Sequence, residues 1–229
     1  MANISSIMRL LQFTDSTFPV GTFSFSNGLE TAAQYGLVHD AATLEQFTWS
    51  QALQGAYSDG VVAILAHRAA LAGDYDAILE ADARLLEFRM NDEARLMLRR
   101  MGKKLAELSS HLADSPIARR WLEDIKAEKT PGCYPVAQGI VFAAAGIGER
   151  DLFCSSQYGI INMVLSAALR CVRVSHYDTQ EILFRFSERI GHLYDEASQM
   201  TLDDMHSFVP QIDILASLHE KGNMRMFMN

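Results

Sequence analysis

The stretch at residues 14–30, which reads TDSTFPVGTFSFSNGLE, places the strongest constraint on the fold, because it forces the chain to end a helix and turn. The apolar spacing over residues 6–13 predicts a helix before it. Pro19 fixes its own φ and favours an extended backbone at Phe18. Gly21 permits a backbone conformation that residues with a side chain avoid. We therefore expect one helix to end within this stretch and a second helix to begin after the turn.

The second helix is expected to begin near Asn27. The side chain of Asn27 can cap the first helical turn while Glu30, three residues later, reaches back, which is the spacing of a capping box. The turn itself holds three aromatic side chains among polar ones, namely Phe18, Phe23 and Phe25. Rings of this kind favour burial over contact with water, so we expect the turn to pack into a groove or onto a partner. A plain corner between two helices is the alternative interpretation.

Apolar residues at helical spacing dominate the rest of the chain, and no stretch of useful length alternates as a strand does. One helix face has apolar residues separated by four, four, three and four positions, at Met97, Met101, Leu105, Leu108 and Leu112. Small residues fill positions 136–146, which predicts a helix packed at the centre of the fold. Gly55 predicts a break between two helices, the second of which starts at Ser58. We predict an all-α protein of roughly eight to ten helices, folded as a single domain over residues 1–229.

Composition narrows the class of protein. The 229 residues are 49% hydrophobic, enough for a sizeable core, and they carry a net charge of −8. This charge, without a basic run, disfavours nucleic acid as the main partner. The most apolar run, residues 160–174, is interrupted by polar side chains and is too short to span a bilayer, so we expect a buried core helix. Three widely spaced cysteines do not form a disulfide framework. With no signal peptide recognised at the N-terminus, the chain is expected in the cytoplasm.

No motif predicts a catalytic site. The sequence contains neither the G-x-x-x-x-G-K-[ST] loop that binds nucleotide phosphates nor the G-x-S-x-G turn that carries a serine nucleophile. His219 and Glu220 begin like the zinc motif H-E-x-x-H, but Asn223 occupies the position of the second histidine. We therefore assign no catalytic residue and no metal ligand. His219 is the best single candidate for contact with a metal, and its alternative role is that of a cation near a helix C-terminus.

A stripe of cations lies on the face of a predicted helix opposite its apolar residues. Arg95, Arg99 and Lys103 are one turn apart, and Arg100 and Lys104 flank them. The simplest interpretation is a face exposed to solvent. The functional alternative is a docking face for an acidic partner, and the sequence leaves both interpretations open.

Four blocks of sequence resemble the UreF family of urease accessory proteins. The first block is the turn, which matches the family signature without a gap at Asp15, Ser16, Pro19, Gly21, Phe23, Ser24, Ser26, Gly28, Leu29 and Glu30. Phe25 departs from it, since many relatives have histidine there. Two internal blocks match at Glu93, Arg95, Leu96, Met101, Gly102, Tyr134, Pro135 and Gly139. The last block matches at Pro210, Asp213, His219, Glu220, Arg225 and Phe227.

This resemblance implies a UreF-like, all-α protein that is cytoplasmic, usually dimeric and not an enzyme. Members of the family are chaperones of urease maturation that bind the accessory protein UreD, also called UreH, and the GTPase UreG. The assembly inserts nickel into apo-urease, so nickel and GTP are handled through partner proteins and no cofactor is bound directly. The expected role is that of a scaffold, with neither nucleic acid nor membrane among its partners.

The resemblance also implies which residues contact partners. We expect the C-terminal tail, about residues 208–229, to dock into UreD, and the Phe-rich turn with Glu30 to form or support the face for UreG. An arginine given to the GTPase in trans, from Arg95 or Arg89, is a further hypothesis. The full set assigned to partner binding is Phe18, Pro19, Phe23, Ser26, Glu30, Arg95, Tyr134, His219, Glu220, Arg225 and Phe227. Two alternatives stay open: a stand-alone nickel-binding or storage protein, and an undetected hydrolase on a helical fold.

Overall fold

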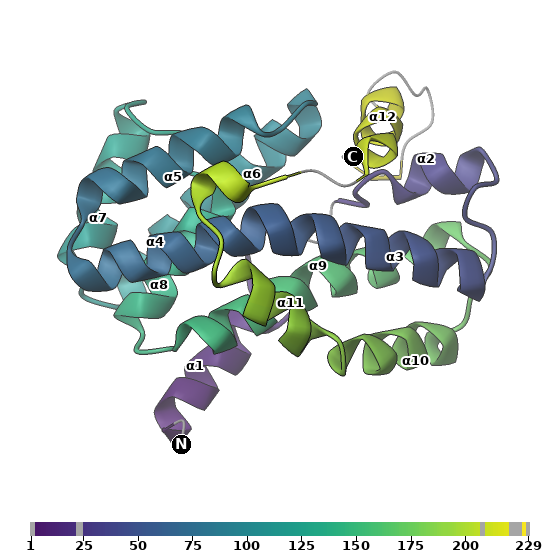
Figure 1. Ribbon diagram of the computed structural model, residues 1–229, viewed down its shortest axis with the longest axis horizontal. Helices are drawn as coiled ribbons and strands as arrows, with labels where there is room; N and C mark the ends of the chain where they lie inside the picture. The colour runs from purple at the N-terminus through teal and green to yellow at the C-terminus, as the bar shows by residue number, and fades with distance from the viewer. Residues whose placement is uncertain (1–2, 22–24, 207–208, 220–225, 228–229) are drawn as a thin grey trace.

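The computed structural model describes residues 3–21, 25–206, 209–219 and 226–227, and these residues form helices and no strands (Figure 1). The all-α prediction is confirmed. The first half of the chain forms α1 (Ile4–Thr14), α2 (Leu29–Gln34), α3 (Ala41–Gly55), α4 (Val61–Ala72), α5 (Tyr75–Glu87) and α6 (Asp92–Leu112). The second half forms α7 (Pro116–Lys126), α8 (Tyr134–Ala144), α9 (Glu149–Cys171), α10 (His176–Ser187), α11 (Ile190–Ala197), the short 3₁₀ turn η3 (Leu202–Asp204) and α12 (Pro210–His219).

The small-residue helix α8 lies at the centre of the fold, as its composition predicts. Its residues from Pro135 to Phe142 are all buried, and it packs against α4 and α6. A Cβ atom at Gly139 would lie 2.7 Å from the carbonyl oxygen of Ala63. Only glycine therefore allows α4 and α8 to approach this closely.

One buried carboxylate holds the turn before α8. Asp82 of α5 is fully buried, and its Oδ2 accepts hydrogen bonds from the Thr130 hydroxyl at 2.6 Å and the Gly132 amide at 2.9 Å. Its Oδ1 accepts a third from the Cys133 amide at 2.7 Å. The same turn lies against Gly102 of α6, where any Cβ atom would overlap the Gly132 carbonyl oxygen. These contacts fix the start of α8 relative to α5 and α6.

Gly55 does not end a helix, and the predicted break is wrong. α3 continues through one π-helical turn, Ala56–Gly60, into α4, so the chain crosses the molecule as one long rod (Figure 1). The glycines instead allow α9 to approach. A Cβ atom at Gly55 would overlap the Ile160 side chain, and one at Gly60 would lie 2.6 Å from the Phe153 ring. Glycine here serves close packing, which local sequence does not distinguish from a helix break.

Among the described helices, α9 is the one long and apolar enough to cross a membrane by length and composition. In its apolar window, 56% of the residues are buried inside the fold. Helices α1, α2, α3 and α8 pack around it. This is the packing of a core helix, as predicted for residues 160–174.

Helix α12 packs against α2 and α6, so the last described helix lies beside a helix from the first forty residues, whereas α1 projects away on the other side of the molecule (Figure 1). Gly28, just before α2, has a φ of 78°. A Cβ atom there would lie 3.3 Å from the Ile212 carbonyl oxygen and the Ala216 amide of α12. A glycine at this position thus supplies both the left-handed backbone and the room that α12 needs.

Candidate functional site

Residues from three distant parts of the sequence meet where α2, α6 and α12 pack together. We call this group the Glu30 cluster: Glu30, Glu93, His219, Met226 and Phe227. The Glu30 side chain is 2% exposed. Its Oε1 accepts the Met226 amide at 2.9 Å, and its Oε2 accepts the Phe227 amide at 3.2 Å. Two main-chain hydrogen bonds to one buried carboxylate therefore hold residues 226–227 against the start of α2.

His219 lies between two carboxylates of the cluster. Its Nε2 is 3.0 Å from Glu30 Oε2, its Nδ1 is 3.0 Å from Glu93 Oε2, and its side chain is 2% exposed. A neutral imidazole donates from only one nitrogen. Hydrogen bonds at both ring nitrogens therefore need either a protonated ring that donates twice, or a neutral ring that donates to one carboxylate and accepts from a protonated carboxyl group. A protonated ring would offset part of the negative charge that the fold encloses here.

The chain itself buries the Phe227 ring. Phe227 is 5% exposed, and the guanidinium carbon of Arg170, on α9, lies 3.9 Å from the ring centroid in a cation–π contact. The tail is expected to dock into UreD, but the ring of Phe227 is not available for such a contact in this structure, because α9 and the apolar cluster around α2 already cover it.

The predicted capping box at Asn27 is also wrong. Asn27 and Gly28 have positive φ values, 52° and 78°, and α2 begins only at Leu29, with Gly28 at its N-cap position. The Glu30 amide instead donates to the Ser26 hydroxyl at 3.4 Å. The left-handed backbone separates the Asn27 side chain from the first turn of α2, and the Glu30 carboxylate turns to the tail.

Other residues assigned to partner binding lie outside the Glu30 cluster. Phe18 is half-buried, with its ring edge-to-face against Phe13 at a centroid distance of 5.4 Å, whereas Pro19 is exposed. Ser26 is fully buried. Arg95 is exposed on α6. Three further residues of the set lie outside the described residues, namely Phe23, Glu220 and Arg225.

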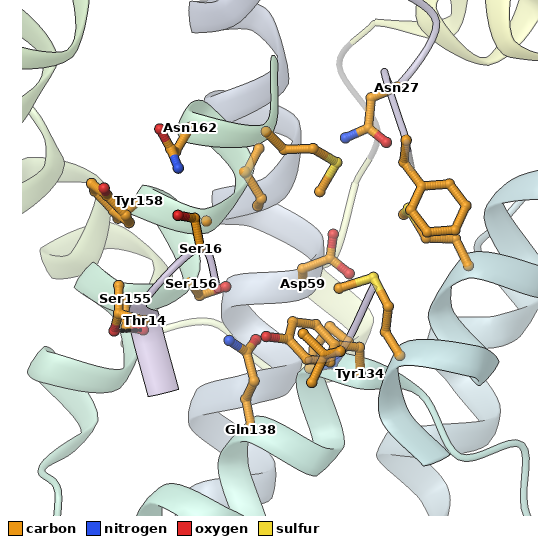
Figure 2. A pocket seen from close by; sticks show the side chains of 18 of the residues that line it. Thr14, Ser16, Asn27, Asp59, Tyr134, Gln138, Ser155, Ser156, Tyr158 and Asn162 are labelled. Atoms are coloured by element: carbon orange, nitrogen blue, oxygen red, sulfur yellow. Dashed lines mark hydrogen bonds between the residues drawn. The ribbon is translucent and has the colours of Figure 1, made fainter. Parts of the chain in front are cut away.

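The described residues of the Phe-rich turn line a small cavity (Figure 2). Its volume is about 130 Å³, and α6, α8 and α9 form its other sides. Phe25 of the turn is 5% exposed, so the turn packs onto this chain's own helices. Tyr134 and Gln138 project from α8, while Thr14 donates to or accepts from Ser155 at 2.6 Å. Burial raises the pKa of Tyr134 to about 12, so its hydroxyl stays neutral near pH 7.

Within the described residues, no group of three or more His, Cys, Asp and Glu side chains is placed to hold a metal ion. In the Glu30 cluster the two carboxylates face opposite edges of the His219 ring, so one ion cannot reach all three groups. Burial raises the pKa of the Cys133 thiol well above its usual value and that of Cys171 to about 11. Both thiols therefore stay protonated near neutral pH, whereas a metal ligand must be a thiolate.

Arg89 is not placed to enter a partner's active site. It is 8% exposed and forms an ion pair with Asp59. Its carbonyl oxygen accepts a hydrogen bond from Arg95 Nε at 2.8 Å. The hypothesis of an arginine given in trans is therefore wrong for Arg89, and for the exposed Arg95 it stays a prediction.

Two side chains that contact this site, those of Glu93 and Arg170, were not predicted as site residues. Glu93 matches a block of the family pattern, which was its only signal in the sequence. Arg170 looks like an ordinary interruption of an apolar run, and nothing in the sequence indicates that it covers Phe227. The Glu93–His219 contact joins residues 126 positions apart, and the Arg170–Phe227 contact joins α9 to a segment after α12. Local sequence patterns do not encode contacts of this kind.

The described residues form an all-α protein in which Glu30 and His219, two residues of the family signature, hold residues 226–227 of the same chain. The sequence model of the UreF family matches residues 38–187. The chain is 47% identical over 227 residues to the urease accessory protein UreF of Yersinia pestis (strain Pestoides F), which covers 99% of this chain and 100% of the relative. It is 48% identical over 227 residues to urease accessory protein UreF 2 of Brucella abortus (strain 2308), which covers 99% of this chain and 93% of the relative. The chain therefore belongs to the UreF family of urease accessory proteins.

Proposed function

We propose that this chain is a scaffold of urease maturation that binds UreD and the GTPase UreG, and couples GTP hydrolysis by UreG to nickel delivery into apo-urease. Nickel is the cargo of this assembly and GTP is the substrate of UreG. The observation that most supports the proposal is the Glu30 cluster. Glu30, His219 and Phe227, which the resemblance assigns to partner binding, meet there and hold residues 226–227 in a fixed position beside α12.

The surface next to the cluster supports docking of UreD. Ile214 and Leu218 lie one turn apart on α12 and are 58% and 40% exposed, and Met226 is 57% exposed. With Phe227 buried, these three side chains take its place as the apolar residues that UreD would cover. Burial of such surface favours association by about 25 cal/mol per Å² of apolar area.

The N-terminal end carries a second exposed apolar face. α1 projects from the helical body (Figure 1), and Ile4, Met8 and Leu11 are 80%, 62% and 59% exposed. Their spacing of four and three residues places them on one side of the helix. This face leads into the turn that carries the exposed Pro19. It supports the assignment of this end of the molecule to UreG.

A third surface supports a homodimer. A groove between α9 and α10 has a mainly apolar lining, which includes Tyr177 and Phe184, and these two residues are 82% and 73% exposed. Two copies related by a two-fold axis would cover the same patch on each other. We place the assembly in the cytoplasm, where free cysteines such as the three of this chain stay reduced.

Replacing Ile214 and Leu218 together by serine tests the docking of UreD. Co-purification with tagged UreD should fall at least about tenfold, because burial of one such side chain contributes about 1.5–3 kcal/mol. Activation of urease in cells should fall with it. The matched control replaces Leu71 and Leu112, which are 67% and 51% exposed elsewhere on the surface, and should retain the complex. Full retention of UreD by the first variant, with an unchanged melting curve, contradicts the proposal.

A further inference from the structure

The cationic stripe on α6 forms one wall of a groove with a volume of about 640 Å³. We call it the basic groove. Its cations come from α6 and the end of α7, and they are Arg95, Arg99, Arg100, Lys103 and Lys126. Its apolar lining is Leu86, Leu96, Ile125 and Pro131. Two acidic residues, Asp92 and Glu128, complete it. The groove therefore combines an excess of positive charge with an apolar lining.

The cations of the groove differ from several arginines elsewhere in the chain that are neutralised by carboxylates. Arg68, Arg84 and Arg185 each form an ion pair with a carboxylate. In the described part of the chain, no such pair involves Arg99 or Lys103. They lie one helical turn apart, so their like charges repel each other. The fold thus keeps an unfavourable concentration of positive charge on the surface of a chain whose net charge is −8.

Arg95 adds a fixed donor at the rim of the groove. Its Nε donates to the Arg89 carbonyl oxygen at 2.8 Å, which orients the planar guanidinium group. Arg95 as a residue is exposed. A guanidinium held in this way loses less freedom when it binds a carboxylate in the fork geometry that suits arginine.

We propose that the basic groove docks an acidic, partly apolar segment of a partner protein. Its positive rim complements carboxylates, and Leu96, which is 42% exposed, offers apolar contact at the same place. From Asp92 to Lys103 the α6 wall is about 17 Å long at 1.5 Å per residue, enough for about three turns of a short helix. A nucleic acid would use the cations but not the apolar lining, and beyond the groove its phosphates would meet a chain of net charge −8.

This interaction surface goes beyond the proposed function, because only Arg95 of the groove belongs to the set that the resemblance assigns to partner binding, and the surfaces assigned above lie on other helices. The groove lies on α6 and α7, whereas the surface for UreD lies on α12 and the surface for a second copy on α9 and α10. In Figure 1, α7 and α10 lie at opposite ends of the long axis. A partner in the groove therefore leaves the α9–α10 surface accessible.

The chain offers a matched pair of variants for the test. Lys103→Glu reverses a charge in the groove, and Lys104→Glu makes the same change on the neighbouring residue, which is exposed but does not line the groove. The probe is a fluorescein-labelled helical peptide of about 11 residues, made of glutamate and leucine at helical spacing. Its binding to the full chain is measured by fluorescence anisotropy. Circular dichroism melting of each variant verifies that it folds.

The peptide should bind the wild type. Its affinity for Lys103→Glu should be about tenfold lower, whereas its affinity for Lys104→Glu should stay within about twofold of the wild-type value, because interface charges act mainly at close range. Leu96→Ser should also weaken binding, since it removes apolar contact. Failure of the peptide to bind, or equal losses in both lysine variants, would overturn the proposal. So would tighter binding of a single-stranded oligodeoxynucleotide than of the peptide. A change in the chain's own oligomeric state by Lys103→Glu alone would assign the groove to a second copy and overturn it as well.

Discussion

Replacing Glu30 by glutamine tests whether the buried carboxylate holds the C-terminal residues. Glutamine is close in size to glutamate but has one acceptor oxygen and no charge. In the wild type the amides of Met226 and Phe227 donate one hydrogen bond to each carboxylate oxygen, and His219 Nε2 lies 3.0 Å from Oε2. In the variant an NH₂ group replaces one oxygen. At least one of these donors therefore loses its acceptor.

The expected cost follows from the burial of the site. Because Glu30 is 2% exposed, water cannot replace the lost acceptor. A hydrogen bond to a charged group contributes about 1.5–3 kcal/mol, and removal of one partner from a buried charge pair costs about 3–5 kcal/mol. These two losses overlap, so we expect about 3 kcal/mol for Glu30→Gln. Most of it should appear as local release of residues 226–227, because the α4–α8 core does not depend on this contact.

Native-state hydrogen exchange measures this release at the Met226 and Phe227 amides. A loss of about 3 kcal/mol corresponds to a roughly hundredfold decrease in their protection. The matched control is Glu45→Gln, which removes a surface carboxylate that pairs with Arg185 at 2.8 Å and should leave both amides protected. Equal protection of the two amides in the wild type and in Glu30→Gln would refute the reasoning. It would show that packing of Phe227 alone holds the tail.

Two further predictions concern global stability. Gly102→Ala places a methyl group against the backbone of Gly132, so the free energy of unfolding measured in urea should fall by about 1–3 kcal/mol. The matched control is Gly159→Ala, whose Cβ would meet nothing within 4 Å, and it should be neutral or stabilising. The hydrogen bond from Arg68 lowers the pKa of Glu149 from 4.5 to about 2. Because the folded state favours the ionised form, this carboxylate stabilises the fold above pH 4.5, and its contribution is lost as the pH falls from 4.5 towards 2. The full shift corresponds to about 3 kcal/mol, which solvent screening of the partly exposed pair reduces to about 1–2 kcal/mol. Urea titrations at neutral pH and near about pH 3 should therefore show a smaller acid sensitivity for Glu149→Gln than for the wild type, and equal sensitivity would contradict this assignment.

The sequence predicted helices well where periodicity and caps agree. Asn91 caps α6, because its side-chain oxygen accepts a hydrogen bond from the Ala94 amide, and Met101 and Leu105 on the predicted face are buried. Leu112 on the same face is 51% exposed, because α6 extends past the core at its C-terminal end. Periodicity identifies the side of a helix that faces the core but not where the core ends.

The candidate site was harder to predict because local and distant partners compete for the same side chain. Glu30 has the spacing of a capping partner, and this local pattern is complete in itself. Its actual partner, His219, lies 189 positions away in the sequence, and the two meet only because α12 packs on α2. The resemblance named both residues without indicating that they touch. Only the three-dimensional packing joins them.

Burial divides the family-signature residues into two physical groups. At Gly28, Gly102 and Gly139 an added Cβ would meet the backbone of another segment, so glycine there is explained by close packing alone. Pro19 and Arg95 are exposed, and the structure gives Arg95 one hydrogen bond, to the Arg89 carbonyl oxygen, but no close packing that requires either residue. If both groups acted through the fold, substitution at either should lower the melting temperature. If the exposed pair acts through partners, Pro19→Ala and Arg95→Ala should leave melting unchanged and reduce only complex formation, which makes these two positions the sharper probes of the proposed scaffold.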